Sequence, residues 1–520
     1  MTRFLKHPFF PLIILLAVNL AAGFLTFHHY GMSWDEPLFY DYANSIRVAY
    51  TPAAFAPGFD FYQVFGKSPE DHKIYGPAYL LLARPIQQAV MAVLKTDMAS
   101  AWHLVNFLAF QLGLGAFYGL VRRWLAPWPS AAATAFLAWQ PVFWGHAFIN
   151  PKDAPFMVFF LLALALGLDF VDRLSVRTGE HRPVQPALLV NLAFAGILLG
   201  LTSAIRVIGP LAGVIVFVYF LLKKNWRGFP LFSVYGLVAL VTMFVFWPYL
   251  WADPINRLLE VLKHMSNNPT ELAVLFNGQI FRANEMPRRY LPQVLAMTLT
   301  EPTWILFFAG LVVAIRNFLA KKVDWRAPLV LLGLFGFMLA YLMYNKPSVY
   351  DGFRHFLFIT PPVFVFIGFS LEWLWEKLKP AIWSAVVILL LLPGLVGIVR
   401  LHPYEYSYYN LLTGGVGGAF RSYETEYWLT CYKEAIEWAL ANEPGTTLHI
   451  QREFPLAEYY GADLALRDLG RETENDILPG DLLLFQTRAD LDLRSNYRKL
   501  PAEHIIGRDG AEFCILKRKN

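Results

Sequence analysis

Long apolar runs recur through the first 400 residues of this chain, and they restrict its fold more than any other feature. One run covers residues 7–27, and ten similar runs follow it. About 20 consecutive apolar residues cross the hydrocarbon core of a bilayer as a helix. Because 56% of the residues are hydrophobic and only 16% are charged, a water-soluble protein is excluded. The pattern predicts a polytopic α-helical membrane protein with about 11 transmembrane helices.

The positive charges between these runs predict the orientation of the chain. The expected spans are residues 7–27, 101–121, 130–148, 154–171, 187–204, 207–222, 230–249, 298–315, 328–344, 356–374 and 381–399. The basic residues of the short loops then share one side, and such loops face the cytoplasm. They are Arg3, Lys6, Arg122, Arg123, Arg173, Arg177, Arg182, Lys223, Lys224, Arg227, Arg316, Lys321, Lys322, Arg326, Lys377 and Lys379. We therefore expect a multi-pass protein of the cytoplasmic (inner) membrane, with its N-terminus inside and its C-terminus outside.

The apolar segment 74–94 is expected to be an interfacial or re-entrant helix rather than a span. It contains Arg84 and Pro85, and counting it as a span would move every later basic loop outside. The first apolar run has a second interpretation as a secretory signal peptide, but we find no small-residue cleavage site before His28. It is therefore expected to remain as the first span.

We expect two domains, a transmembrane domain at 1–400 and a soluble domain outside the membrane at 401–520. In the second domain, one helical pattern precedes three short alternating runs that predict strands. These are residues 431–442, followed by 446–451, 481–487 and 511–517. The order predicts a small α/β domain. Its two cysteines, Cys431 and Cys514, either form a disulfide, as in many exported proteins, or remain buried free thiols.

Two adjacent carboxylates, Asp35 and Glu36, follow the first span and precede an amphipathic segment at 38–50. Ionisable groups at the edge of a membrane are costly to keep near lipid, and they often mark functional sites. Solvated loop charges are the simpler interpretation. The rigid neighbours Trp34 and Pro37 favour a catalytic site, in which Asp35 acts as a general base at the lipid–water boundary.

Two further outer segments carry candidate site residues. Asp153 opens the fourth span with Pro155 close behind it, which fits a helix N-cap and also a carboxylate that orients a substrate or a cation. Arg206 stands between two apolar stretches. It either snorkels to the membrane surface or binds a lipid phosphate through its guanidinium group.

A dense set of hydrogen-bond donors lies at the outer mouth of the tenth span. Tyr350, Arg354 and His355 occur there within a few residues. A charged anchor beside the membrane explains such a set, but we favour a site for a phosphodiester or pyrophosphate, which requires several donors at once. Lys73 is a weaker candidate for the same anion.

Other kinds of site are not indicated. The chain has no Gly-rich nucleotide loop, no paired His or Cys metal motif and no serine nucleophile elbow. A nucleotide-sugar donor is therefore disfavoured, no cofactor is required, and nothing predicts nucleic-acid binding. A divalent cation shared by Asp35, Glu36 and Asp153 stays open, although no ligand spacing supports it.

The order of these landmarks resembles the GT-C glycosyltransferases of membranes. The chain is most similar to the dolichyl-phosphate-mannose–protein mannosyltransferase-like group, glycosyltransferase family 39, which includes the bacterial aminoarabinose transferases. The features that match are Asp35-Glu36 after the first span, Lys73 and Pro77 before an interfacial helix, Asp153 and Pro155 at the fourth span, and Arg354 with Pro361-Pro362 at the last outer mouth. His355 stands where the family usually has a tyrosine.

The resemblance implies transfer of a sugar from a polyprenyl-phosphate carrier to an acceptor outside the cytoplasmic membrane. It implies that Asp35 is the catalytic base and that Arg354 and Tyr350 bind the lipid phosphate. It does not identify the acceptor, which is a lipid, a glycan or a protein. The alternatives are a transporter or flippase of a lipid-linked or anionic substrate, and an inactive scaffold. We see no internal duplication typical of transporters, and the ionisable residues cluster at the outer rim, which favours the enzyme.

Overall fold

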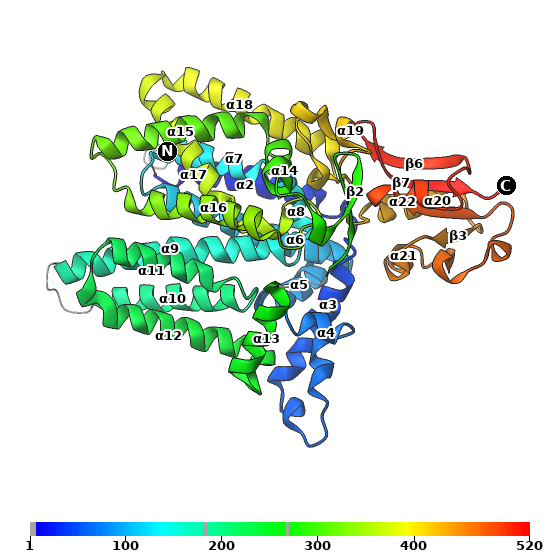
Figure 1. Cartoon of the computed structure of the whole chain (residues 1–520), viewed down its shortest axis with the longest axis horizontal. Helices are drawn as coiled ribbons and strands as arrows, with labels where there is room; N and C mark the ends of the chain where they lie inside the picture. Colours follow the sequence, from blue (N-terminus) through cyan, green and yellow to red (C-terminus); the bar gives the residue numbers. More distant parts are fainter. Residues whose placement is uncertain (1–6, 180–184, 267–269) are drawn as a thin grey trace.

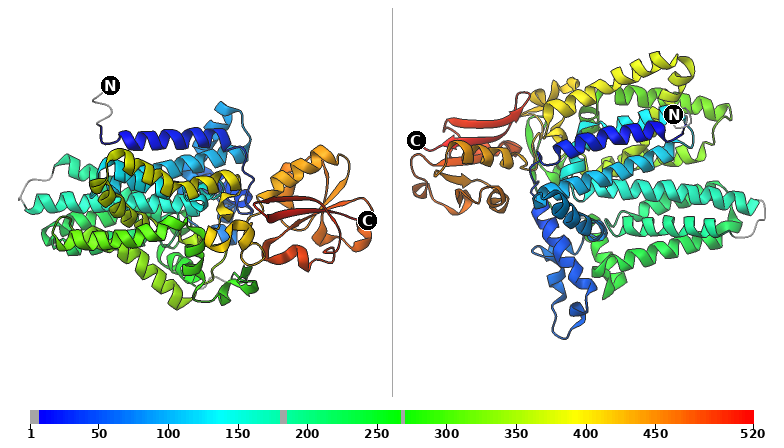
Figure 2. Two further views of the ribbon diagram at one scale, coloured as in Figure 1. Left: turned by 90° about the horizontal axis from the view of Figure 1, so that it is seen from above. Right: turned by 180° about the vertical axis from the view of Figure 1, so that it is seen from behind.

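A computed structural model of the chain describes residues 7–179, 185–266 and 270–520. The basic residues Arg3, Lys6 and Arg182, on which part of the predicted orientation depends, lie outside the described residues. Within them, long helices run side by side along the length of the molecule, and a small sheet projects from one end (Figures 1 and 2).

Seven described helices are long and apolar enough to cross a bilayer. They are α6 (Met98–Val121), α9 (Asp153–Gly179), α10 (Pro186–Ser203), α12 (Phe229–Val245) together with the 3-10 turn before it (Trp226–Gly228), α15 (Glu301–Leu319), α16 (Arg326–Asn345) and α18 (Pro380–Leu401). Large apolar side chains such as Leu240 and Ile305 remain exposed on their outer faces, where a membrane would cover them. The chain is therefore a helical membrane protein, and the expected number of eleven spans stays a prediction.

Shorter helices complete the bundle. They are α2 (Phe10–Thr26), α5 (Ala78–Leu94), α11 (Pro210–Leu222) and α17 (Pro361–Lys377). The span expected over 130–148 consists of two helices, α7 (Pro127–Ala138) and α8 (Pro141–Ile149). Pro141 explains the break, because a proline disfavours helical backbone in the residue before it. The amide of that residue, Gln140, donates to the hydroxyl of Thr300 at 3.0 Å and ties the break to α15.

The segments predicted to lie outside the membrane gather at one end of the bundle (Figure 1). They include α3 (Glu36–Ser45), α4 (Pro69–His72), α13 (Pro254–Ser266) and α14 (Tyr290–Thr298), together with the hairpin of β1 (Ala273–Phe276) and β2 (Gln279–Arg282). The amphipathic segment predicted at 38–50 is α3 followed by a 3-10 helix, Ile46–Tyr50. The C-terminal end of α9 lies at the opposite end of the bundle.

The C-terminal sheet has the strand order β4-β3-β5-β7-β6. Its strands are β3 (Thr447–Ile450), β4 (Ala465–Asp468), β5 (Leu482–Gln486), β6 (Ala502–Arg508) and β7 (Ala511–Arg518). Strands β3, β4 and β5 run parallel, and β7 is antiparallel to its neighbours. The sequence predicted β3, β5, β7 and the helix α20 (Cys431–Asn442), but it did not predict β4 or β6. Cys431 and Cys514 form a disulfide, which joins the start of α20 to β7.

Residues 402–430 connect the sheet to the bundle and pack across its end. The amide of Asn410 donates to the carbonyls of Ala296 and Leu299 at 2.8 and 2.9 Å. Gly145 of α8 lies so close to this segment that an added Cβ would stand 2.5 Å from the nitrogen of Tyr406. This packing holds the sheet against the end of the bundle where the predicted site residues lie.

Candidate active site

Three carboxylates from distant parts of the chain meet at this end of the bundle. Asp35 stands at the N-cap of α3, Asp153 is the first residue of α9, and Asp351 lies in the turn before the 3-10 helix Arg354–Ile359. Pro37 and Pro155 lie in the first turns of α3 and α9, where the fixed φ angle of proline favours the start of a helix. Asp351 and the glycine after it both have positive φ angles, 56° and 68°. A tight turn of this kind brings the Asp351 carboxylate to the side chain of Arg354.

Arg354 lies at the centre of the three carboxylates. Its guanidinium donates to Asp153 at 3.0 Å and to Asp351 at 2.9 and 3.2 Å, and it lies 3.6 Å from Asp35. The Arg354 side chain is only 1% exposed, and Asp153 and Asp351 are as deeply buried. A buried cation of this kind is stable because its partners satisfy its donors.

Lys152 and Arg206 bring two further positive charges to the cluster. The Nζ of Lys152 lies 2.8 Å from Asp35, and Arg206 forms an ion pair with Asp153. Lys152 also lies over the rings of Phe39 and Tyr75, with its Nζ 5.1 and 5.6 Å from their centroids. These aromatic contacts favour the charged ammonium group beside Asp35.

A cavity of about 240 Å³ opens beside the cluster. Asp35, Lys152 and Tyr350 line one part of it, while Ser68 and Asp71 line another. Tyr350 also covers the Arg354 guanidinium, at 5.3 Å from its ring centroid, and contacts His355 edge to face at 4.7 Å. The cavity thus joins a carboxylate, an ammonium group and a phenol to further polar groups, as a site for a polar ligand requires.

The cations control the ionisation of Asp35. Burial alone raises the pKa of this carboxyl, but the charges of Lys152 and Arg354 outweigh burial and hold the pKa below its ordinary value. Asp35 therefore stays ionised at neutral pH and can accept a proton or bind a cation. With a side chain that is 21% exposed, it is the most accessible carboxylate of the three.

Known proteins were compared with this chain at the levels of sequence and structure. No family model matches the sequence, and no curated protein matches it. Crystal structures of ArnT from Cupriavidus metallidurans superpose on it with a TM-score of 0.50, in the apo state and bound to undecaprenyl phosphate. Each alignment covers 97% of both chains, at 13% and 14% sequence identity. The chain has the GT-C fold. The resemblance seen in the sequence is confirmed at the level of the fold.

A more distant GT-C structure is the archaeal oligosaccharyltransferase AglB from Archaeoglobus fulgidus, determined with an inhibitory peptide and a dolichol-phosphate. The alignment has a TM-score of 0.48 at 12% identity and covers 90% of this chain and 66% of that chain. This likeness is too weak to support an argument about the site.

Two predicted site residues lie away from the cluster in this GT-C fold. Glu36 is fully buried, and its carboxylate accepts hydrogen bonds from the backbone of Ser33 and the hydroxyl of Tyr40 and contacts His103 at 2.9 Å. Lys73 pairs with Glu70 at 2.8 Å and with Glu260 of α13 at 3.4 Å. Glu36 therefore anchors the start of α3 to His103 of α6, and Lys73 links the first outer loop to α13.

The structure adds Lys152, Asp351 and Arg488 to the predicted set. Lys152 stands beside the predicted Asp153, but its pairing with Asp35 depends on a contact between distant segments. Asp351 stands beside the predicted Tyr350 and pairs with Arg354 three residues further along the chain. Arg488 belongs to the C-terminal sheet domain, where no motif marked it. Among the described residues, no three His, Cys, Asp or Glu side chains are arranged to hold a metal ion. Because Glu36 is turned away, the trio Asp35, Glu36 and Asp153 does not form a common site.

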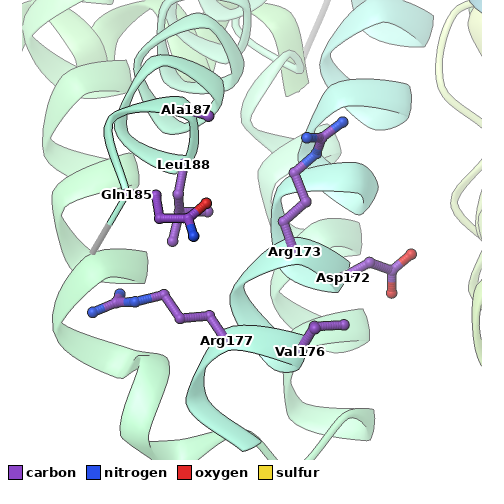
Figure 3. A pocket seen from close by; sticks show the side chains of 7 residues that line it. All are labelled: Asp172, Arg173, Val176, Arg177, Gln185, Ala187 and Leu188. Carbon is purple, nitrogen blue, oxygen red and sulfur yellow. The ribbon is translucent and has the colours of Figure 1, made fainter. Parts of the chain in front are cut away.

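Figure 3 shows the side chains that line a second cavity. It has a volume of about 330 Å³ and lies between α9 and α10, beside Arg173, Arg177 and Gln185. Asp153 and Arg177 lie near the two ends of α9, so about 24 residues, or roughly 36 Å of helix, separate this cavity from the carboxylates. It is therefore not part of the candidate site.

Proposed function

We propose that this protein is a membrane glycosyltransferase that moves a sugar from a polyprenyl-phosphate carrier to an acceptor outside the cytoplasmic membrane. The observation that carries the proposal is the cluster of Asp35, Lys152 and Arg354 beside a cavity at one end of the bundle. ArnT, which has the same fold, has been crystallised with undecaprenyl phosphate, and this supports a polyprenyl phosphate as the carrier.

In the proposed reaction Asp35 is the general base of a single, inverting displacement. The acceptor hydroxyl loses its proton to the Asp35 carboxylate as its oxygen forms a bond to C1 of the sugar. The bond from C1 to the phosphate oxygen breaks at the same time, and the lipid phosphate leaves with the electron pair. The developing negative charge on that phosphate requires cations and hydrogen-bond donors nearby.

In this proposal Lys152, Tyr350 and Arg206 bind the lipid phosphate. Arg354 is almost fully buried and already bound by Asp351 and Asp153, so its role is to hold the carboxylates in place. Lys152 lines the cavity. A phosphate that attracts Lys152 would also weaken its hold on Asp35, and the pKa of Asp35 would rise when the donor binds. His355 supports the ring of Tyr350.

The proposal places eleven spans in the inner membrane, with the N-terminus in the cytoplasm and residues 401–520 as a separate domain outside. Two features support this orientation. The polar segments share one end of the bundle, and a disulfide between Cys431 and Cys514 forms readily only in an oxidising compartment. Reporter fusions after α18 and after the C-terminus test it, because both are expected to report an outer location.

Proteoliposomes that contain the purified full chain provide the test of function. Radiolabelled hexosyl and pentosyl polyprenyl phosphates are added with an extract of the cell envelope as the source of acceptor. We expect label to pass to an acceptor. Label carried across the bilayer without transfer would instead indicate a flippase, and the absence of both results with every donor would make the proposal wrong.

The pH dependence of transfer should shift when Lys152 is changed to Met. The charge of Lys152 lowers the pKa of Asp35, so its loss raises that pKa. Because the base works only when ionised, activity falls as pH drops through this pKa, and the acid limb of kcat/KM should move to higher pH. The change Lys67→Met, at an exposed lysine of the outer loop that carries Asp35, should leave the limb in place. An unmoved limb in Lys152→Met would mean that Asp35 is not the titrating base.

A further inference from the structure

Arg488 connects the C-terminal sheet domain to the carboxylate cluster. It follows β5, and its side chain is buried. Its Nη1 donates to one oxygen of Asp351 at 2.6 Å and to the carbonyl of Tyr427 at 2.8 Å. The other oxygen of Asp351 accepts both hydrogen bonds from Arg354. Arg488, Asp351 and Arg354 thus form a continuous chain of charge-assisted hydrogen bonds that ends at Asp153. Asp35 lies 3.6 Å from the same Arg354 guanidinium, as an ion pair.

The C-terminal part of the chain also contacts Trp34, the residue that precedes the candidate base Asp35. The guanidinium of Arg488 lies 4.6 Å from the ring centroid of Trp34, and that of Arg452 lies 4.5 Å from it. The backbone nitrogen of Trp34 donates to the carbonyl of Trp428 at 3.1 Å. The ring of Trp428 in turn lies 4.7 Å from the Arg354 guanidinium. Residues from the C-terminal part therefore contact both sides of the cluster.

The backbone after Arg488 has an unusual conformation. Ala489 and Asp490 both have positive φ angles, 47° and 54°. This region is unfavourable for residues with a Cβ, and two successive residues adopt it only when other contacts compensate. This turn begins directly after Arg488, whose side chain reaches Asp351 at the end of the bundle, and such strain is typical of functional sites.

We propose that Arg488 is a positioning residue that orients Arg354 through Asp351, so that the active site is complete only when the C-terminal domain is docked on the bundle. This inference rests on the proposed function, because it gives the domain a part in the same transfer reaction. Without Arg488, Asp351 would lose its second cation and Arg354 would move toward Asp351 and away from Asp35. Asp35, which faces Lys152, Arg354 and Asp153, would then be held less firmly as a carboxylate.

The test compares Arg488→Met and Arg488→Lys with the wild type in the full chain. We expect kcat for transfer to fall about 10- to 100-fold in Arg488→Met, with KM for the lipid donor changed by less than about threefold. The acid limb of the pH profile should move to higher pH. Arg488→Lys should recover part of kcat, because it keeps the charge but loses the guanidinium fork. The matched control is Arg471→Met, at an exposed arginine of the same domain that pairs with Asp468, and it should leave all of these quantities unchanged.

The outcomes separate the inference from the function on which it rests. An active wild type with an equally active Arg488→Met overturns the inference alone. A lower yield of folded Arg488→Met with unchanged kcat and unchanged pH limb per folded molecule also overturns it, because that result describes a purely structural residue. A wild type that transfers no sugar from any donor overturns the proposed function and the inference together.

Discussion

Changing Asp35 to Asn should lower the rate of sugar transfer by at least about 100-fold, since this is the typical contribution of a general base. The amide keeps the size of the side chain but cannot accept the proton of the acceptor hydroxyl. The loss should appear in kcat, while the amount of folded protein and the affinity for the lipid donor stay close to wild type. Single-turnover transfer in proteoliposomes, measured with saturating donor, gives this rate directly.

The matched control is Asp60→Asn in the same outer loop. Asp60 is exposed and caps a 3-10 helix by accepting a hydrogen bond from the nitrogen of Tyr62 at 3.0 Å. The amide oxygen of an asparagine can make the same bond, so this change removes a charge without removing a cap. Transfer at the wild-type rate by Asp35→Asn, with Asp60→Asn also normal, would remove Asp35 from the mechanism.

Changing Arg354 to Met should lower the free energy of unfolding by about 3–5 kcal/mol, the usual effect of removing one partner from a buried ion pair. Asp153 and Asp351 are almost fully buried and would lose the cation between them. Arg354→Lys keeps the charge but makes fewer hydrogen bonds, so its effect should be intermediate. Unfolding of the purified variants in mixed micelles measures these differences.

Arg282→Met serves as the control for the Arg354 prediction. Arg282 pairs with Glu271 at 3.4 Å, but both side chains are exposed, by 61% and 60%. An exposed pair of this kind contributes about 1 kcal/mol or less. If the two arginine changes cost the same, the carboxylate cluster is more accessible to water than its burial indicates.

The fold and several site residues were predictable because their signals are local. The apolar runs predicted the membrane helices, and the pattern at 431–442 predicted α20 with its observed bounds. Asp35, Asp153, Arg206, Tyr350 and Arg354 are candidates from the sequence because each stands at the mouth of an apolar segment, where a charge or a polar group is conspicuous. The structure brings these five residues to one end of the bundle, as the predicted topology requires.

The remaining features depend on contacts that sequence patterns do not contain. Glu36 and Asp35 are neighbours in the chain, yet at the start of α3 their side chains have different partners. Glu36 contacts His103, whereas Asp35 pairs with Lys152. The sequence favours an anion as the partner of Lys73. In the structure Lys73 instead pairs with Glu70 and with Glu260, which belongs to α13, nearly 200 residues further along the chain. Arg488 could not be identified because its role depends on how a separate domain docks. The short strands β4 and β6 lack a clear alternating pattern.

The disulfide and the position of Arg488 have a consequence for biosynthesis. The ribosome makes Asp35 several hundred residues before Arg488 and Cys514. Under the proposed mechanism a nascent chain has every span in place before its reaction centre is finished. Activity then begins only after the C-terminal domain, which the disulfide between Cys431 and Cys514 cross-links, has been exported and docked. The order of synthesis itself therefore delays the first turnover.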